Sequence, residues 1–329
     1  MQLGIHDLLP LEQGETTLDR YQKTIEMVQA LEGMGYDRYW ASEHHGMVNN
    51  ASSSPEILIA YLAAKTQSIR LGTGGTMIVN YSPLKVAEWF KTLSLLAPGR
   101  IDLGIGRAPG ADQAGMIALA SGNPISFDYL YEKAQVILDY MMDQKPSAFY
   151  GQVKAIPEAV GQPAQPWMLG SSGNSAVQTG KMGLGYSFAR WFALNVDADV
   201  FAQYRKNFKP SDFFSDPRVM VSYLIICADS PEEADYLAKP MEIQRASDLS
   251  QPLLSPKAAQ EYSFSLKDQA LIDSYYQRHF MIKGTPDQVK AILEDEIKEF
   301  GIDELMIYSP IPDQKARLRS YELLHQALK

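Results

Sequence analysis

Short runs of apolar and β-branched residues recur along the chain and alternate with segments of helical periodicity. Each run is almost continuously hydrophobic, which is typical of parallel strands covered by helices on both faces. The pattern predicts eight strands, which are Leu3–His6, Arg38–Glu43, Ile69–Met77, Ile101–Gly106, Trp167–Gly170, Tyr186–Ala189, Val219–Cys227 and Glu304–Tyr308.

The segments between these runs carry signals for the ends of helices. Apolar residues three or four positions apart predict a helix over Leu18–Leu31 that stops near Gly33 and Gly35. A hydroxyl residue followed by proline is a common helix start, because proline suits the first turn. Three such starts follow predicted strands, namely Ser54-Pro55, Ser82-Pro83 and Ser230-Pro231, and Thr285-Pro286 has the same pattern.

Eight parallel strands that alternate with helices form either a closed barrel or a doubly wound open sheet. The number of strands favours an α/β fold of the (β/α)8 TIM barrel type. A dinucleotide-binding open sheet would need G-x-G-x-x-G after the first strand, whereas Leu8–Leu18 contains only Gly14. Such a barrel uses about 250 residues. We therefore expect residues 1–329 to form a single barrel domain, with loop insertions near 108–126, 143–165 and 240–283.

Composition and charge exclude several classes of protein. There are 30 Lys and Arg residues against 39 Asp and Glu, and the net charge of −9 opposes broad binding to nucleic acid or to a membrane surface. No apolar run approaches the roughly 18 residues that cross a bilayer, and Met1–His6 lacks the features of a signal peptide. We expect a cytoplasmic protein. Cys227 is the only cysteine, which excludes an internal disulfide and a cysteine-based zinc site.

In a (β/α)8 barrel the active site lies where the strands end and the following loops begin. The residues at these positions are therefore the candidates for chemistry. They are His6, Glu43–His45, Gly74–Met77, Arg107, Ser171–Gly173, Arg190-Trp191 and Tyr308-Ser309.

One of these positions is suited to an anion. Trp167–Ala176 passes from an apolar run through small hydroxyl residues into a predicted helix. Free N–H groups and the positive end of the helix dipole would hold a phosphate there, although a serine-rich helix cap explains the same residues. Arg107 could supply a guanidinium to that anion or form a surface ion pair.

Glu43–His45 has the residue types of a metal site. Neighbouring residues on a strand point to opposite sides, so His44 and His45 are poorly placed to share an ion, and no metal is predicted. We interpret one of these histidines as a general base or flavin-contacting group and the other as structural. The glycines of Gly72–Thr76 mark a tight turn or the close approach of a flat ligand.

Together these segments resemble the bacterial luciferase-like flavin-dependent monooxygenases, and in particular their single-chain, non-luminescent members. The resemblance covers nearly the whole chain and is carried by Trp40–His45, Ile69–Gly75, Pro98–Gly110 and Leu169–Gly173. It implies a barrel that binds FMN at the carboxyl ends of its strands. It also implies that reduced FMN, supplied by a separate flavin reductase, and O2 oxygenate a small aldehyde-like or other apolar substrate. Relatives often form homodimers.

The resemblance also implies roles for individual residues. His44 matches the catalytic histidine of the family, and Gly74-Gly75 falls where relatives carry a non-proline cis peptide. Arg107 and the Ser171, Ser172 and Ser175 region would hold the FMN phosphate. The full set of expected cofactor contacts is Ala41, Gly74, Gly75, Thr76, Arg107, Gly170, Ser171, Ser172, Gly173 and Ser175. The expected substrate contacts are Met77, Arg190 and Trp191, with Phe192 as a further wall, and 240–283 would be a mobile loop that acts as a lid.

Three positions depart from the family pattern. Gly106 replaces the reactive thiol of true luciferases, which argues against light emission, and Ala118–Ser121 replaces residues that are often basic. Many relatives have a histidine near Arg190-Trp191, which indicates a rebuilt substrate pocket. The alternatives are a flavin-binding protein without turnover, a deazaflavin-dependent dehydrogenase on the same fold, and a metal-dependent hydrolase.

Overall fold

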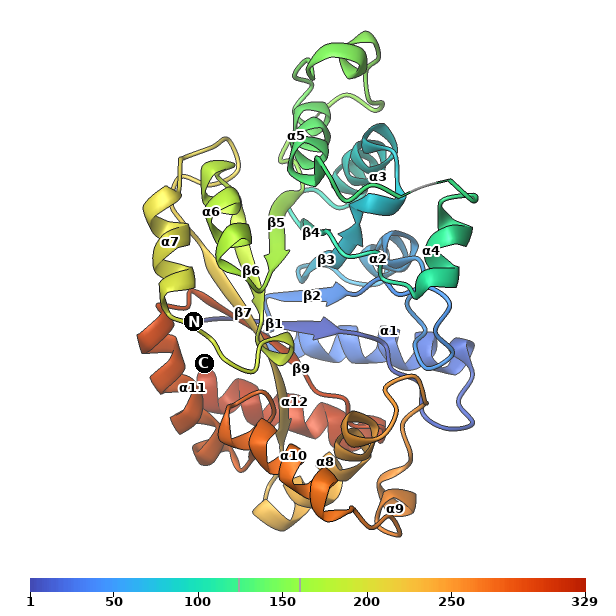
Figure 1. The fold of residues 1–329 in the computed structure, drawn as a ribbon, viewed down its shortest axis with the longest axis vertical. Helices are drawn as coiled ribbons and strands as arrows, with labels where there is room; N and C mark the ends of the chain where they lie inside the picture. Colours follow the sequence, from blue (N-terminus) through green and yellow to red (C-terminus); the bar gives the residue numbers. More distant parts are fainter. Residues whose placement is uncertain (124, 160) are drawn as a thin grey trace.

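The eight predicted strands close into one parallel barrel (Figure 1). A computed structural model of the chain describes residues 1–123, 125–159 and 161–329. The ring runs β1-β2-β3-β4-β5-β6-β7-β9, and β9 pairs with β1 to complete it. The predicted (β/α)8 TIM barrel is confirmed. The strands are β1 (Gln2–Asp7), β2 (Arg38–Ala41), β3 (Arg70–Met77), β4 (Ile101–Gly106), β5 (Gln165–Gly170), β6 (Gly185–Ala189), β7 (Val219–Cys227) and β9 (Glu304–Tyr308).

Helices surround the ring, and several begin and end at the predicted signals. Gly35 adopts a left-handed φ of 89° directly after α1, and its N–H donates to the carbonyls of Leu31 and Glu32. The α-helices are α1 (Thr17–Met34), α2 (Pro55–Ala63), α3 (Pro83–Leu96), α4 (Gln113–Leu119), α5 (Leu130–Met141), α6 (Gly173–Lys181), α7 (Asp199–Asn207), α8 (Pro231–Ala246), α9 (Pro256–Ala259), α10 (Leu266–Gln277), α11 (Pro286–Phe300) and α12 (Gln314–Leu328). Short 3-10 helices are η1 (Ile78–Asn80), η2 (Ala148–Gln152) and η3 (Arg190–Phe192).

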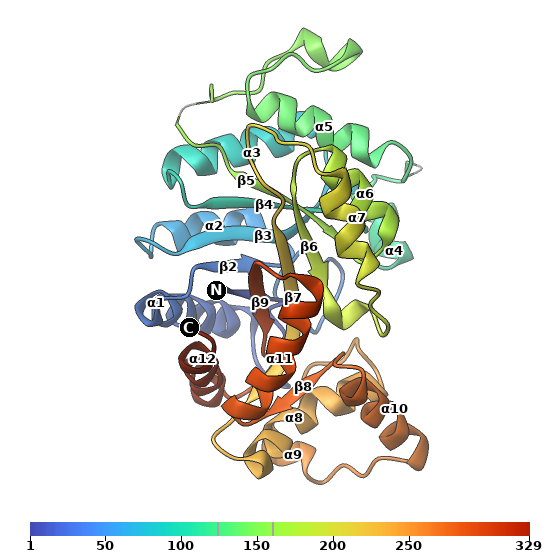
Figure 2. The ribbon, with the colours of Figure 1, turned by 90° about the vertical axis from the view of Figure 1, so that its left-hand side faces the viewer.

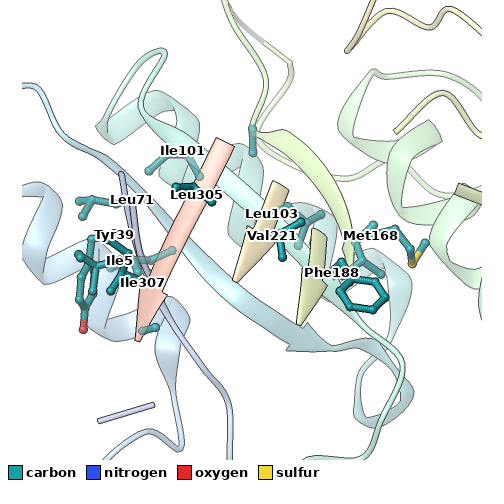
Figure 3. Packing of buried hydrophobic residues seen from close by; sticks show 14 of the residues in the cluster. Ile5, Tyr39, Leu71, Ile101, Leu103, Met168, Phe188, Val221, Leu305 and Ile307 are labelled. Atoms are coloured by element: carbon teal, nitrogen blue, oxygen red, sulfur yellow. The ribbon is translucent and has the colours of Figure 1, made fainter. Parts of the chain in front are cut away.

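The main core lies between the outer face of the barrel and the helices (Figure 3). Ile5, Tyr39, Leu71, Leu103 and Val221 come from five different strands, and all are fully buried. The helices bury the outward-pointing side chains, and the barrel interior shields the inward-pointing ones from water. Because both faces are buried, the strands appear in the sequence as nearly continuous apolar runs.

Large and small residues share the inside of the barrel. The indole rings of Trp40 and Trp167 meet edge to face with centroids 6.2 Å apart. Gly72 makes room for this pair, because a Cβ atom at that position would lie 2.7 Å from Nε1 of Trp40. The middle of the barrel is therefore a packed core and not a channel.

An ion-pair network fills the amino end of the barrel. Asp102 accepts hydrogen bonds from Nη1 of Arg38 at 2.8 Å and from Nε of Arg70 at 2.9 Å. Nη2 of Arg38 also lies 2.7 Å from Oε2 of Glu304. These residues stand at or near the first positions of their strands, so the network closes the end that is remote from the expected active site.

Two additions extend the barrel at opposite ends of the molecule (Figures 1 and 2). The segment that follows α5 and contains η2 projects beyond α3, while α8, α9 and α10 gather at the other end. The expected insertion at 240–283 has more regular structure than a loop, because α8 continues through Pro240 to Ala246 and α9 and α10 follow. An unpredicted strand, β8 (Ile282–Gly284), pairs with β7 beside the ring.

The other two expected insertions are also partly helical. α4 lies within 108–126 but buries none of its side chains, and η2 lies within 143–165. Pro124 and Val160 belong to these two stretches and lie outside the described residues. Across the part of the chain that the structure describes, no helix has both the length and the apolar character needed to cross a membrane.

Candidate active site

A cavity of about 300 Å³ opens at the carboxyl ends of the strands. It is lined by residues at or just after the carboxyl ends of β1 to β6, which are far apart in the sequence, as the barrel geometry predicts. Predicted site residues that line it are His44, Gly74, Met77, Arg107, Gly170, Ser171, Ser172 and Trp191, together with the expected wall residue Phe192.

Arg107 and the start of α6 form one corner of the cavity. Nη1 of Arg107 donates to the hydroxyl of Tyr131 at 2.5 Å, and the guanidinium carbon lies 5.0 Å from the centroid of that ring. Nε of Arg107 is buried without a hydrogen-bond partner among the described residues. Ser172 is the N-cap of α6, so the positive end of the helix dipole lies at the same cavity. This donor set suits a phosphate, which needs a guanidinium, hydroxyls and N–H groups together.

Ser175, which was expected to contact the cofactor, is instead engaged inside the helix cap. Its Oγ donates to the carbonyl of Ser172 at 2.6 Å and lies 3.1 Å from the hydroxyl of Tyr186. Ser175 is fully buried and does not line the cavity, so it positions the loop and leaves the cavity surface to Ser171 and Ser172.

Four more of the expected cofactor contacts are not among the cavity-lining residues, namely Ala41, Gly75, Thr76 and Gly173. Ala41 is fully buried and pairs with Thr73 in the sheet. Oγ1 of Thr76 lies 2.9 Å from Oγ1 of Thr73, so this hydroxyl is used within β3. The bond between Gly74 and Gly75 is cis, as the resemblance implied.

His44 offers a neutral imidazole to the cavity. Burial lowers its pKa from the ordinary 6.5 to about 4, despite the opposing charge of Glu43. Nδ1 of His44 is buried and has no hydrogen-bond partner among the described residues. The ring is therefore uncharged near pH 7, and its free nitrogen can form a hydrogen bond with a bound molecule or accept a proton that the reaction releases.

His45 turns away from the cavity toward Glu43. Its Nε2 lies 2.8 Å from Oε1 of that carboxylate, which also accepts from the hydroxyl of Tyr81 at 2.8 Å. The second oxygen of Glu43 accepts the N–H of Met77 at 2.9 Å. Glu43 therefore ties the loop after β2 to the end of β3. The predicted strand Arg38–Glu43 ends at Ala41, so Glu43, His44 and His45 belong to the loop after β2. The two histidines therefore point apart because of the loop conformation and not because of strand alternation.

His6 also lines the cavity, and unlike His44 it is almost fully buried. Its Nε2 lies 2.5 Å from the carbonyl oxygen of Gly74, which can only accept, so this nitrogen carries the proton. Nδ1 then accepts from the hydroxyl of Ser222 at 3.1 Å. Desolvation by burial is the main reason why the pKa of His6 is lowered to about 4. Its position at a strand end marked it as a candidate, but its partners are not visible in the sequence.

Arg190 does not line the cavity, although a substrate contact was predicted for it. Its Nη1 donates to the carbonyl of Ala193 at 2.6 Å, and its Nε lies 3.4 Å from Oε2 of the buried Glu296. Nη2 of Arg190 also donates to the carbonyl of Arg278. These contacts fasten η3 to α11 and to the segment after α10.

The remaining walls of the cavity are largely apolar. Sequence reasoning did not single out Leu8, Leu169 and Ala189, because an apolar residue beside a strand usually belongs to the core. Ser42 also lines the cavity, and its hydroxyl donates to the carbonyl of Gly74 at 3.2 Å. No group of three or more His, Cys, Asp or Glu side chains that could hold a metal ion occurs among the described residues.

A protein-family model described as luciferase-like monooxygenase matches residues 1–304. The chain belongs to the luciferase-like monooxygenase family. It is 35% identical over 320 residues to a luciferase-like monooxygenase of Escherichia coli (strain K12), covering 96% of this chain and 94% of the relative. It is 31% identical to the N-acetyl-S-alkylcysteine monooxygenase of Bacillus subtilis (strain 168), with 100% and 98% covered.

Solved structures of the luciferase-like monooxygenase fold show the same architecture. Apo-MsnO8 superposes with a TM-score of 0.87 at 31% identity, over 99% of this chain and 98% of that one. The oxygenating constituent of 3,6-diketocamphane monooxygenase from Pseudomonas putida, in complex with FMN, has a TM-score of 0.73 at 19% identity, over 100% and 98%. An F420-dependent secondary alcohol dehydrogenase has the same TM-score at 16% identity, over 100% and 99%. The fold by itself therefore does not select between FMN and F420.

Proposed function

We propose that this protein is a flavin-dependent monooxygenase that uses reduced FMN and O2 to oxygenate a small, largely apolar molecule. The observation that carries the proposal is the position of Arg107. Its guanidinium has no carboxylate partner among the described residues and lies beside the N-terminus of α6, at the rim of an apolar cavity. Support also comes from relatives above 30% identity that are named as monooxygenases.

Arg107, Ser171 and Ser172 would hold the phosphate of FMN. A guanidinium, two hydroxyls and the end of a helix dipole together compensate the charge of a phosphate group. The bound flavin would supply the reducing electrons and the reaction with O2.

The protein's own contribution would be to exclude water and to control protons. Leu8, Met77, Leu169, Trp191 and Phe192 give the cavity apolar walls, which favour an apolar substrate and keep water from the reaction. His44 would take up or return a proton at its unpartnered imidazole. His6 would hold the carbonyl of Gly74 in place at the cavity edge.

Electrons would reach the site from a separate flavin reductase. The chain has no G-x-G-x-x-G motif between β1 and α1, so we expect no nicotinamide dinucleotide site of that type in this barrel. We therefore expect reduced FMN to bind as a co-substrate.

Anaerobic titration with reduced FMN and with reduced F420, followed by mixing with air-saturated buffer, tests this function. We expect tighter binding of reduced FMN and a delayed appearance of oxidised FMN absorbance compared with free reduced FMN. Immediate reoxidation would support a flavin-binding protein without turnover. Tighter binding of F420, with no reaction with O2, would support the deazaflavin-dependent dehydrogenase.

A further inference from the structure

The short helix η3 carries two neighbouring wall residues of the cavity, and they are held in different ways. Trp191 and Phe192 both line the cavity. Trp191 is fully buried, and the centroid of its ring lies 5.2 Å from that of His6 and 5.6 Å from that of Tyr308. Phe192 is 66% exposed, so little packing holds its ring. The position of Phe192 therefore depends on what fixes the backbone of η3.

Arg190, the first residue of η3, closes this turn. Its backbone carbonyl accepts the N–H of Ala193 at 3.1 Å, and its Nη1 donates to the carbonyl of Ala193 at 2.6 Å. Its Nη2 donates to the carbonyl of Arg278, in the segment after α10. The guanidinium thus holds the residue that follows Phe192 and joins the turn to a second segment of the chain.

Glu296 of α11 holds this guanidinium in place. Oε2 of Glu296 lies 3.4 Å from Nε of Arg190, and Oε1 lies 3.4 Å from Nη2. Oε2 also accepts the hydroxyl of Tyr223 at 2.7 Å, and Oε1 lies 2.8 Å from Nδ1 of His279. Tyr223 belongs to β7, and His279 follows α10. One carboxylate therefore ties η3 to β7, to α11 and to the segment after α10.

The ion pair between Arg190 and Glu296 is nearly fully buried. Removing two charges from water costs free energy, and apolar residues of similar volume often stabilise a fold as well or better. What a buried ion pair adds is direction, because its hydrogen bonds allow only a narrow range of arrangements. Here the arrangement that it fixes is that of a cavity wall, since Phe192 lies in the turn that Arg190 closes.

We propose that Glu296, acting through Arg190, is a positioning residue that keeps Phe192 at the wall of the cavity and thereby sets the affinity for an apolar substrate. Neither Glu296 nor Arg190 contacts the substrate. Loss of the carboxylate loosens η3 and withdraws the ring of Phe192, whereas Trp191 stays in its aromatic cluster. This inference rests on the proposed function only in taking the cavity as the substrate pocket.

Calorimetric titration of the flavin-free protein with 1-hexanol, used as an apolar probe, tests the proposal. We expect Phe192→Ala to bind the probe about fivefold more weakly than the wild type, because the ring no longer shields the probe from water. The ring is exposed, so this variant should keep the fold. Glu296→Gln keeps the volume of the side chain and removes its charge, and it should weaken binding to a similar extent.

A double-mutant cycle tests whether Glu296 acts through Phe192. When Glu296→Gln is added to Phe192→Ala, the affinity for 1-hexanol should stay that of Phe192→Ala alone, because the ring that Glu296 positions is absent. Additive losses would overturn the proposal. An affinity of Glu296→Gln equal to that of the wild type would also overturn it.

Two control variants separate positioning from a general loss of stability. Glu294→Gln changes an exposed carboxylate of the same helix, which pairs with Lys290, and should leave the affinity unchanged. Asp102→Ala removes a buried carboxylate at the amino end of the barrel, so it should lower the unfolding temperature and leave the affinity for 1-hexanol unchanged. Equal losses of affinity in Asp102→Ala and Glu296→Gln would overturn the proposal, because lowered stability would then explain both.

Hydrogen exchange at the amide of Ala193 gives an independent readout. This N–H closes η3, so its exchange rate reports opening of the turn. The rate should rise in Glu296→Gln and in Arg190→Met and stay unchanged in Glu294→Gln. The wild-type rate in Glu296→Gln would show that the carboxylate does not hold the turn.

Titration of the wild type with FMN keeps this proposal apart from the proposed function. If FMN fails to bind but the effects of Glu296 and Phe192 on 1-hexanol binding are coupled, the proposed function fails and the positioning role stands. If FMN binds and the two effects are additive, the positioning role fails and the proposed function stands.

Discussion

Arg107 and Tyr131 form a pair in which a neutral partner holds the cation. Nη1 of Arg107 donates to the Tyr131 hydroxyl at 2.5 Å, with the guanidinium carbon 5.0 Å from the ring centroid. The contact orients the guanidinium without neutralising it. A charge arranged in this way remains available to an anion, and in the proposed function that anion is the phosphate of FMN.

The first prediction follows from this pair. Arg107→Ala should weaken FMN binding about ten- to a hundredfold, because a hydrogen bond between charged groups contributes about 1.5–3 kcal/mol. Riboflavin has no phosphate, so its affinity should not change. Fluorescence titration with both flavins measures the two effects, and Tyr131→Phe, which keeps the charge, is the control. Equal weakening of both flavins would remove Arg107 from the phosphate role.

His44→Ala should separate binding from chemistry. The side chain has a buried nitrogen without a described partner, so its loss leaves the fold and the affinity for FMN intact. Oxygenation should fall about 10²–10⁴-fold, as expected for loss of a positioned acid or base. The fraction of consumed O2 that is released as hydrogen peroxide should rise accordingly, and this fraction is the measurement. His45→Gln is the control, since His45 contacts Glu43. A peroxide yield unchanged by His44→Ala would refute the assignment.

Asp102→Ala should destabilise the barrel without touching the cavity. The substitution removes the carboxylate that Arg38 and Arg70 share and leaves Glu304 as the remaining partner of Arg38, and loss of one partner from a buried ion pair costs about 3–5 kcal/mol. Urea denaturation measures this change in the free energy of unfolding. Glu294→Ala, at an exposed pair with Lys290, should change it by less than about 0.5 kcal/mol. Similar losses for both substitutions would contradict the role assigned to Asp102.

His6 and His44, whose pKa values are lowered in the folded protein, predict how stability depends on pH. The unfolded chain protonates His6 and His44 near pH 6.5, whereas the folded protein does so near pH 4. The unfolded state thus binds more protons in this window, so stability falls as the pH is lowered from about 6.5 to about 4. Each histidine contributes roughly 1.4 kcal/mol per pH unit there.

His6→Gln isolates one of these contributions. The side-chain amide of glutamine can replace the donor to Gly74 but does not titrate. The slope of the unfolding free energy against pH, measured between pH 6.5 and 4, should therefore decrease by the contribution of about one proton. Urea denaturation at several pH values measures the slope. Identical slopes for the wild type and His6→Gln would show that His6 is not buried as a neutral ring.

The barrel was predictable because its strands are long enough to show their pattern. Val219–Cys227 and Ile101–Gly106 are largely apolar runs, interrupted only by Ser222 and Asp102, and each matches its strand end for end. β8 gives no such signal, since it has three residues and pairs only with β7. A loop was expected from residue 240 onward, but α8 continues through Pro240, whose ring is buried within the packed helix.

The site was predictable as a set of strand ends but not as a set of contacts. Arg107 and His44 line the cavity as expected, because their positions after β4 and β2 fix their place. Ser175 and Arg190 have side chains that satisfy other buried groups, and these partners are far away in the sequence or within the helix cap.

Diffraction from crystals of the protein soaked with FMN tests the central claim most directly. The account predicts density for the isoalloxazine in the cavity beside His44, with the phosphate within hydrogen-bonding distance of Arg107 and Ser172. A flavin bound elsewhere, or a phosphate that contacts neither residue, would contradict it.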